Sequence, residues 1–282
     1  MICFRTSQDL SAYISQVHRF GRLIGFVPTM GALHQGHLSL LEQAKQQGGL
    51  TVCSIFVNPT QFNDPADFEK YPVHLEQDIY LLAKHGLDIL FLPSVAQLYP
   101  EGLSHLEHYE LGYLEQILEG SSRPGHFQGV CQVMHRLLSL VQPDHLFMGQ
   151  KDFQQCLVVR LLIDQAYPRV AMHTCPTLRE PDGLAMSSRN ARLHASDRKQ
   201  AAAIYQALQQ LQQRLQPGGL SAILAQARDF LESQGFLVDY VQIADAATLR
   251  RVDHWDGKEK LVALVAAFLH GIRLIDNLLL NP

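Results

Sequence analysis

Residues 25–41 read G-F-V-P-T-M-G-A-L-H-Q-G-H-L-S-L-L, and this stretch decides the fold. The apolar run at 23–27 is typical of a buried parallel strand. Pro28 and Gly31 end the run, and the leucines that follow are spaced as on one face of a helix. The stretch therefore predicts a strand, a tight loop and a helix that begins near His34.

The junction between this loop and helix is a candidate anion site. The first turn of a helix carries unpaired backbone N–H groups and the positive end of the helix dipole, which favour phosphate. His34 and His37 are three residues apart, so they share one face and can reach the same anion. Gly31 and Gly36 allow a ligand to approach the backbone. A lone histidine is more often a surface or core side chain, but two on one face favour binding. No G-K-[ST] follows, so this is not a Walker loop.

The composition is that of an ordinary soluble globular protein. The chain has 282 residues, of which 47% are hydrophobic and 18% charged, enough for one large or two ordinary domains. A formal net charge of −4 gives no general basic field, so we expect no nucleic-acid partner. The longest apolar run, at 261–269, is too short to cross a bilayer, so we expect no membrane insertion.

The cysteines and the N-terminal sequence favour a cytoplasmic location. The five cysteines, at positions 3, 53, 131, 156 and 175, show no C-x-x-C pair and no metal-ligand spacing. Buried, reduced thiols are the expected state, as in cytoplasmic enzymes. The first residues, M-I-C-F-R-T-S-Q-D-L, lack a basic segment followed by an apolar core, so we expect no secretory signal.

Strand-like and helix-like segments alternate as far as residue 175, which predicts an α/β domain with a parallel sheet. The expected helices span residues 7–20, 74–85 and 131–141, and the further strands span 50–57, 87–92, 145–148 and 169–175. Beyond residue 190, amphipathic helices at 196–215 and 221–234 precede strands at 237–243 and 261–269, an order typical of an α+β domain. We therefore place one domain at residues 1–177 and a smaller one at 178–282.

Ligands of open parallel sheets bind beyond the carboxyl ends of the strands, where the next loop also begins. Residues 58–72 follow the strand at 50–57, and Asn58 and Gln61 offer neutral amides for hydroxyl groups or a carboxylate. A solvated turn rich in proline and asparagine is an equally good interpretation of this loop on composition alone.

Two later loops repeat the arrangement. In residues 149–155, Lys151 can meet phosphate and Asp152 can accept from a ribose hydroxyl, although a capped helix with a solvent-exposed lysine explains the same residues. Residues 176–190 contain Gly183, two serines and an arginine, and such loops can close over a bound nucleotide. The alternative is a linker between the domains.

Five motifs in these segments resemble those of the pantothenate synthetases, the pantoate–β-alanine ligases. They read P-T-M-G-A-L-H-Q-G-H, F-V-N-P-T-Q-F, E-G-S-S-R-P-G-H-F, Q-P-D-H-L-F-M-G-Q-K-D-F-Q-Q and D-G-L-A-M-S-S-R-N. They keep the order and spacing of that family across residues 24–192, and V-A-A-F-L-H-G-I-R-L-I-D-N near the C-terminus matches as well. The resemblance therefore covers nearly the whole chain.

The resemblance implies a Rossmann-like nucleotide-binding domain of the nucleotidyltransferase superfamily, with its H-x-G-H motif at 34–37. It further implies a small C-terminal lid domain that carries the mobile M-S-S-R-N loop, and a homodimer. The implied reaction uses ATP and Mg²⁺ in two steps. Pantoate and ATP give pantoyl adenylate and pyrophosphate, and β-alanine then displaces AMP to form pantothenate.

The resemblance also implies the site residues. His34, His37 and Lys151 are the expected catalytic residues, which hold the triphosphate. Gln61 and Gln155 are expected to hold pantoate, and Gln61 also to lie beside β-alanine. The complete expected ATP site consists of Met30, Gly31, Ala32, Leu33, His34, Gln35, Gly36, His37, Gly149, Gln150, Lys151, Asp152, Leu178, Met186, Ser187, Ser188 and Arg189.

Several further positions match the family less completely. Asp78 matches an acidic position linked to Mg²⁺, but its neighbour here is Gln77. Val73 stands where the family commonly has arginine, and Gln128 replaces another frequent arginine, so both reduce positive charge near the site. Arg123 and His126 match the R-P-G-H motif, and we give them a supporting role only.

Three other functions compete with this one. A different adenylyl- or cytidylyltransferase could use the same H-x-G-H loop and release a stable nucleotide product. A nucleotide-binding regulatory protein could keep the fold without turnover, although the joint presence of His34, His37, Lys151, Ser187 and Arg189 argues against it. A zinc hydrolase is the weakest alternative, because the fourteen histidines form no H-E-x-x-H or comparable cluster.

Overall fold

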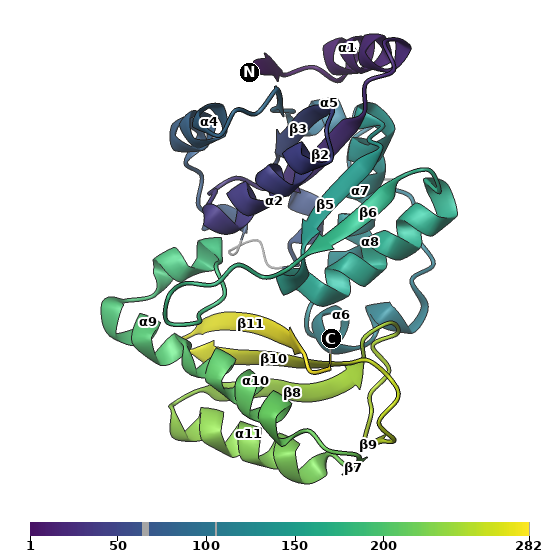
Figure 1. Ribbon diagram of the computed structural model, residues 1–282. Coiled ribbons are helices and arrows are strands. Elements are labelled where there is room, and N and C mark those ends of the chain that lie inside the picture. The colour runs from purple at the N-terminus through teal and green to yellow at the C-terminus, as the bar shows by residue number, and fades with distance from the viewer. Residues whose placement is uncertain (64–67, 105, 282) are drawn as a thin grey trace. The chain divides into compact units, whose positions relative to one another are not determined.

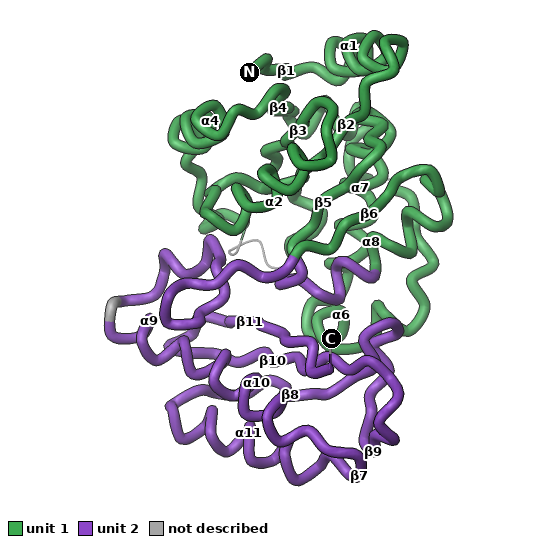
Figure 2. Tube along the Cα trace, in the orientation of Figure 1, with its two compact units in different colours: residues 1–149, 158–175 green, residues 150–157, 176–282 purple. Residues whose placement is uncertain are grey.

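The computed structural model describes residues 1–63, 68–104 and 106–281, and its elements are labelled in Figure 1. The chain forms two compact units (Figure 2), one of residues 1–149 with 158–175 and one of residues 150–157 with 176–282. The short segment 150–157 therefore belongs to the second unit. The domain boundary expected after residue 177 stays a prediction. Of the loop expected at 58–72, residues 64–67 lie outside the described part of the chain.

A six-stranded parallel sheet forms the centre of the first unit. Its strands are β1 (Ile2–Phe4), β2 (Ile24–Thr29), β3 (Leu50–Ile55), β4 (Ile89–Phe91), β5 (His145–Gly149) and β6 (Ala171–Cys175). They are ordered β1-β4-β3-β2-β5-β6, and every neighbouring pair is parallel. The predicted Rossmann-like α/β class is thus confirmed, although β1 is not among the predicted strands.

Apolar side chains line both faces of the central strands, because helices cover both faces of a parallel sheet. Ile24, Phe26, Phe91 and Phe147 are at most 1% exposed. The helices of the connections are α1 (Ser7–Arg19), α2 (Gln35–Gln46), α4 (Leu75–Lys84), α5 (Val95–Leu98), α6 (Leu118–Ser122), α7 (His126–Val141) and α8 (Phe153–Ala166). Short 3₁₀ turns are η1 (Pro59–Gln61), η2 (Gly112–Glu115) and η3 (Gln150–Asp152). Helix α2 contacts β2, β3 and β5, and this packing holds the H-x-G-H residues at the start of α2 in position on the sheet.

Helix α7 begins five residues earlier than predicted, at His126 rather than at residue 131. The prediction was wrong because R-P-G-H-F-Q-G looks like a glycine-rich turn. Only Gly125 serves as the turn, with a left-handed backbone (φ +79°) directly before the helix. Gly129 lies inside the helix, where another segment approaches it closely. His126 consequently lies in the first turn of α7 and is buried.

The second unit contains a three-stranded antiparallel sheet, ordered β11-β10-β8, and a short two-stranded one. Its strands are β7 (Gly218–Gly219), β8 (Leu237–Asp245), β9 (His254–Trp255), β10 (Leu261–Leu269) and β11 (Ile272–Leu279), and its helices are η4 (Ser188–Arg192), α9 (Ala195–Ala201), α10 (Ala203–Arg214) and α11 (Ser221–Ser233). Helices α10 and α11 pack on the three-stranded sheet (Figure 1), with Ile204, Leu208 and Leu231 in the shared core. The predicted α+β character of this part is confirmed.

Several features of the second unit differ from the prediction, which did not include the short strands β7 and β9. The single helix expected at 196–215 is two helices, α9 and α10, because Ala202 forms a turn between them. Strand β11 was not predicted. It forms a hairpin with β10 through His270 and Gly271, both with positive φ (47° and 79°), as a two-residue type I′ turn requires. The H-G pair between two apolar segments is the sequence signal of this hairpin.

None of the described helices combines the length and the apolar character that a membrane-crossing helix needs.

Candidate active site

His34 and His37 cap helix α2 reciprocally. The Nδ1 atom of His34 accepts from the N–H of Gly36 at 3.1 Å, and Nδ1 of His37 accepts from the N–H of His34 at 3.3 Å. This is the geometry of a capping box, with two imidazoles in place of the usual hydroxyl and carboxylate. The two ring centroids lie 4.1 Å apart. The sequence prediction that both histidines share one face at the helix start is confirmed.

The cap also decides which ring nitrogen carries the proton. A nitrogen that accepts an N–H bond is unprotonated, so a neutral ring at either position carries its proton on Nε2. Each imidazole can then donate from Nε2 to an anionic oxygen. This differs from the site expected from the sequence, in which backbone N–H groups of the first turn face the anion. Two of those groups, in residues 34 and 36, are used by the histidines themselves.

Asp78, from α4, holds the loop that leads to the two histidines. Its carboxylate accepts from the N–H of Ala32 at 2.9 Å and from the N–H of Leu33 at 2.8 Å. Asp78 itself is 2% exposed. The loop needs this support because Gly31 and Ala32 both have positive φ (84° and 48°). Any contact of Ala32 and Leu33 with a ligand must therefore use atoms other than their N–H groups.

The fit of Mg²⁺ can be tested on the same residues. Among the described residues, no group of three or more His, Cys, Asp or Glu side chains could hold a metal ion. Both carboxylate oxygens of Asp78 already accept an N–H, so a Mg²⁺ ion at Asp78 would have to share these oxygens with the two N–H groups. The role of Asp78 as a Mg²⁺ ligand stays a prediction. Mg²⁺ commonly binds through substrate phosphates and waters with only one or two carboxylates. The residues present fit an ion that arrives with a phosphate ligand.

Gln61 lies on η1, which packs directly against helix α7. A Cβ atom on Gly129 would lie only 2.2 Å from the carbonyl oxygen of Thr60 and 2.6 Å from Cα of Gln61, so no larger residue fits. Asn58, 1% exposed, joins the two segments: its Nδ2 lies 3.1 Å from O of Gly129 and 3.3 Å from Oε1 of Gln61. Tyr99 donates from its hydroxyl to Oδ1 of Asn58 at 3.0 Å. Asn58 thus holds Gln61 in place, a role that the sequence analysis did not assign to it.

His126 and Arg123 support the backbone of Gln61. Nδ1 of His126 donates to the carbonyl oxygen of Gln61 at 2.7 Å. Nε2 of the same ring lies 3.1 Å from NH1 of Arg123, which donates to it when the ring is neutral. NH2 of Arg123 reaches the same carbonyl at 3.4 Å. The side chain of Gln61 in turn lies 2.9 Å from Sδ of Met30.

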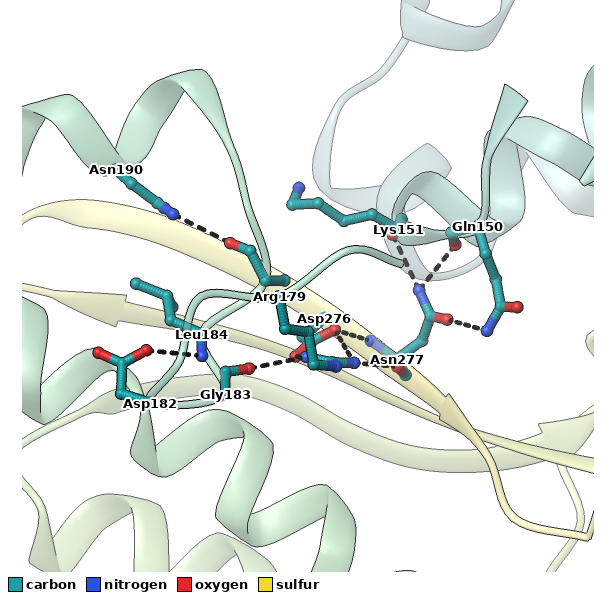
Figure 3. Close-up of polar contacts among 10 residues, drawn as sticks. Gln150, Lys151, Arg179, Asp182, Gly183, Leu184, Asn190, Asp276 and Asn277 are labelled. Atoms are coloured by element: carbon teal, nitrogen blue, oxygen red, sulfur yellow. Dashed lines mark hydrogen bonds and ion pairs between the residues drawn. The ribbon is translucent and has the colours of Figure 1, made fainter. Parts of the chain in front are cut away.

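In the second unit, Lys151 lies on the turn η3, which strand β11 holds (Figure 3). Nδ2 of Asn277 donates to the carbonyl oxygens of Gln150 at 3.0 Å and of Lys151 at 2.8 Å. The ammonium group of Lys151 lies 3.8 Å from a carboxylate oxygen of Asp152, and its side chain is 17% exposed. Gln155 lies in the first turn of α8.

The segment expected as a loop at 176–190 has a defined structure. Arg179 and Ala185 pair across a narrow turn, and the N–H of Met186 donates to O of Leu178. Asn190 donates from Nδ2 to O of Ala185 at 2.9 Å (Figure 3). Residues Ser187, Ser188 and Arg189, the serine–arginine segment, lie at the start of η4. There Oγ of Ser187 accepts from the N–H of Arg189 at 3.3 Å.

Arg179 anchors this hairpin to β11. Its guanidinium makes two bonds to the carboxylate of Asp276, at 2.6 and 3.0 Å, and its carbon Cζ lies 3.9 Å from the ring centre of Tyr205. Burial raises the pKa of Asp276 above its ordinary value, and the hydrogen bond and charge of Arg179 oppose that rise. Gly183 is required at the tip, because a Cβ there would lie 2.4 Å from the ring of Tyr205.

The predicted site residues therefore fall into two groups, each described within its own unit. Met30, the H-x-G-H residues, Gln61 and Gly149 belong to the first unit, and Gln150–Asp152, Gln155, Leu178 and Met186–Arg189 belong to the second. The residues that hold these groups from behind, notably Gly129 and Asn277, were not among the predicted site residues. Asn277 ends the stretch V-A-A-F-L-H-G-I-R-L-I-D-N that matches the family, which was its one signal, whereas Gly129 looked like part of a glycine-rich turn.

Comparison with known proteins places this geometry in context. The sequence model of the pantoate-beta-alanine ligase family matches residues 2–279. Pantothenate synthetase of Cytophaga hutchinsonii is 41% identical over 283 residues, with 99% of each chain covered, and that of Pseudomonas paraeruginosa is 43% identical over 276 residues, with 97% of each covered.

Solved structures agree with the sequence relatives. The crystal structure of pantothenate synthetase from Thermus thermophilus superposes with a TM-score of 0.91 at 40% identity, covering all of both chains. Pantoate-beta-alanine ligase from Francisella tularensis, complexed with β,γ-ATP and β-alanine, gives a TM-score of 0.83 at 35% identity, covering 100% of this chain and 98% of the other.

Proposed function

The chain belongs to the pantoate-beta-alanine ligase family, and we propose which of its residues perform the reaction of that family. The protein is an ATP-dependent ligase that joins pantoate to β-alanine. Pantoate and ATP form pantoyl adenylate and pyrophosphate, and β-alanine then displaces AMP to give pantothenate. The ligands of the Francisella tularensis enzyme, β,γ-ATP and β-alanine, support the same substrates here.

The observation that carries the residue assignment is the reciprocal cap of His34 and His37. In the first step, an oxygen of the pantoate carboxylate attacks the α-phosphorus of ATP, and the bond to the leaving pyrophosphate breaks. Negative charge grows on the leaving group, so fixed donors aimed at it lower the barrier. With Nδ1 engaged by the backbone, each histidine offers Nε2–H to a phosphate oxygen. The capped rings are already oriented, so no rotation is needed during the step.

Lys151, Ser187, Ser188 and Arg189 are the proposed partners of the triphosphate from the second unit. The ammonium and guanidinium groups supply full positive charge, and the hydroxyls donate hydrogen bonds. Adenosine is assigned to the backbone near Met30 and Leu178 with Gly149 and Asp152. In this proposal the serine–arginine segment closes on the nucleotide and keeps water from the acyl adenylate, which would otherwise hydrolyse.

Gln61 and Gln155 are the proposed pantoate residues, and Gln61 also lies beside the β-alanine site. A carboxamide offers both a donor and an acceptor, which suits a substrate with hydroxyl groups and a carboxylate. The rigid support of Gln61 by Asn58 and His126 favours this role, because alignment of the two reactants can contribute about 7–11 kcal/mol in well-oriented reactions. In the second step the amine of β-alanine attacks the acyl carbon, AMP leaves, and no covalent bond to the enzyme forms.

Mg²⁺, a homodimer and a cytoplasmic location complete the proposal. The ion, bound to the ATP phosphates, would reduce the charge that the attacking carboxylate meets. No group of three or more His, Cys, Asp or Glu side chains among the described residues could hold a metal ion, which supports an ion brought by ATP. The homodimer rests on the family resemblance. The location rests on the four buried cysteines, whose expected reduced state suits a reducing compartment.

An omission assay tests the function. The purified protein is incubated with ATP, Mg²⁺, pantoate and β-alanine, and each component is left out in turn. Pyrophosphate release should require pantoate, and AMP release and pantothenate formation should require β-alanine as well. Release of a stable nucleotide product without β-alanine would instead indicate a different nucleotidyltransferase.

The residue roles need a separate measurement. Alanine at His34, His37 or Lys151 should slow adenylate formation at least about 100-fold, as loss of one oriented donor does in other enzymes, while the circular dichroism spectrum stays unchanged. Single-turnover rates near those of the unchanged protein would reject these roles and leave the family assignment intact.

A further inference from the structure

Strand β11 holds the turn of Lys151 through one carboxamide. Asn277 is 2% exposed, and both protons of its Nδ2 are engaged, on the carbonyl oxygens of Gln150 (3.0 Å) and Lys151 (2.8 Å). Its Oδ1 accepts from Nε2 of Gln150 at 3.2 Å (Figure 3). A side chain with two donor protons and an adjacent acceptor is required for this set of bonds. The backbone of η3 is therefore fixed on both sides of the Cα atom of Lys151.

The preceding residue of the same strand holds the hairpin that leads to the serine–arginine segment. Asp276 is 4% exposed and binds the guanidinium of Arg179 through both oxygens. NH1 of Arg179 also donates to O of Gly183, and NH2 to O of Asn277, both at 3.1 Å. Successive residues of a strand point to opposite faces, so Asp276 and Asn277 can serve two different segments.

We propose that Asn277 is the positioning residue of Lys151, and that Asp276 fixes the neighbouring hairpin, so that two consecutive residues of β11 set the spacing of the two cationic segments of the second unit. This inference rests on the proposed contact of Lys151 with the triphosphate. Neither residue touches substrate in this assignment; each acts through the segment that it holds.

The chemistry of the lysine explains why its backbone must be held. Lysine is a point charge on a flexible stem with many rotamers, so its reach is set chiefly by the position of its Cα atom. Removal of the carboxamide leaves two carbonyl oxygens without their donor and frees η3 to shift. An aspartate at position 277 keeps the shape but places a carboxylate against the same two carbonyls, which repels them.

The test compares Asn277→Ala and Asn277→Asp with a matched control, Asn281→Ala. Asn281 also joins two backbone groups of this unit, accepting from N–H of Leu261 at 2.7 Å and donating to O of Glu259 at 2.8 Å, but the structure shows no bond from it to η3. Pantoate-dependent exchange of pyrophosphate into ATP measures the first step. Both variants at position 277 should lower kcat/KM for ATP by roughly 10- to 100-fold, since a shift of about 1 Å has effects of this size.

The same variants should leave KM for β-alanine within about twofold, whereas a general loss of structure would change both steps alike. The control should retain exchange activity within the same limits. If Asn277→Ala does not fold, Asn277→Asp, which keeps the volume, carries the test, and Gln150→Ala removes one of the three bonds from the other partner. Unchanged kcat/KM for ATP in a folded variant at position 277 would overturn the proposal.

A double variant separates this proposal from the proposed function. If Asn277 acts through Lys151, then Asn277→Ala added to Lys151→Ala causes little further loss, because the group that it positions is already gone. Two losses that multiply would show that Asn277 acts independently, and the proposal fails. A Lys151→Ala variant with normal exchange activity would instead reject the role of the lysine and, with it, the premise.

Discussion

Replacement of Gly129 by alanine should damage pantoate binding more than it damages the fold. The substitution adds one methyl group where α7 meets η1. The new Cβ would lie 2.2 Å from O of Thr60 and 2.6 Å from Cα of Gln61, whereas Cβ atoms essentially never approach other atoms within 3.0 Å. Both contacts are backbone atoms, so no side-chain rotation relieves them. The 3₁₀ turn that carries Gln61 must move by about 1 Å, because a close-packed interior leaves little other room.

The size of the effect follows from three terms. Alanine in place of glycine inside a helix normally stabilises a protein by about 0.5–1 kcal/mol. Overpacking of an interior contact costs about 1–3 kcal/mol. The free energy of unfolding should therefore fall by up to about 2.5 kcal/mol. A shift of about 1 Å in a group that positions a substrate can lower the rate about 100-fold, so kcat/KM for pantoate should fall by about that factor.

The assay measures pantoate-dependent pyrophosphate release at saturating ATP, together with a urea titration followed by circular dichroism. The control is Ser139→Ala on the same helix, an exposed side chain whose hydroxyl donates to O of Arg136. It should leave the kinetics unchanged. A Gly129→Ala protein that is destabilised but has normal kcat and KM for pantoate would refute the role of Gln61. A protein with unchanged stability as well would refute the steric argument itself.

Three further predictions concern other parts of the molecule. Asp78→Asn leaves one of the two loop N–H groups without an acceptor. The free energy of unfolding, measured by urea titration, should therefore fall by about 1–3 kcal/mol, and KM for ATP should rise. No change in either quantity would show that the carboxylate does not brace the loop. Burial, and the nearby His145 and Arg160, lower the pKa of His173, so the folded state disfavours the protonated ring. The free energy of unfolding should therefore be highest above the ordinary histidine pKa of about 6.5 and should decline as the pH falls below it. His173→Gln should reduce the difference between the urea midpoints at pH 7.5 and 5.5. Burial raises the pKa of Cys53 to about 12, and Cys3 is the exposed cysteine. A disulfide reagent at pH 8 should therefore modify one thiol rapidly in the native protein and all five in guanidinium. Rapid modification of several thiols in the native protein would contradict their burial.

The sequence was sufficient for the elements whose pattern is local. The buried strand β2 and helix α2, with its start near His34, follow from an apolar run, two turn residues and leucines at helical spacing. The alternation of such units was enough for the parallel sheet, and strand β10 appears at the predicted residues, 261–269. The strands and helices themselves depend on residues a few positions apart, which the order of the amino acids specifies directly, and right-handed connections then bring successive strands together as a parallel sheet.

Local patterns were misleading where a distant segment decides the outcome. The start of α7 was placed too late, because Gly129 looks like a turn residue unless η1 is known to pack against it. The loop before α2 carried no local signal of its partner: Asp78, more than forty positions away in the chain, accepts from the N–H groups of Ala32 and Leu33.

The sequence by itself determined the family, the parallel sheet and the identity of the residues that carry charge and hydrogen bonds, since those are properties of motifs and residue types. The tertiary structure alone decided how they are held. It braces the loop before α2 with Asp78, places Asn58 and Gly129 behind Gln61, and joins Lys151 to Asn277 across 126 positions. Contacts between segments so distant in the chain form only when the sheets and helices pack, because burial then requires every polar group to find a partner.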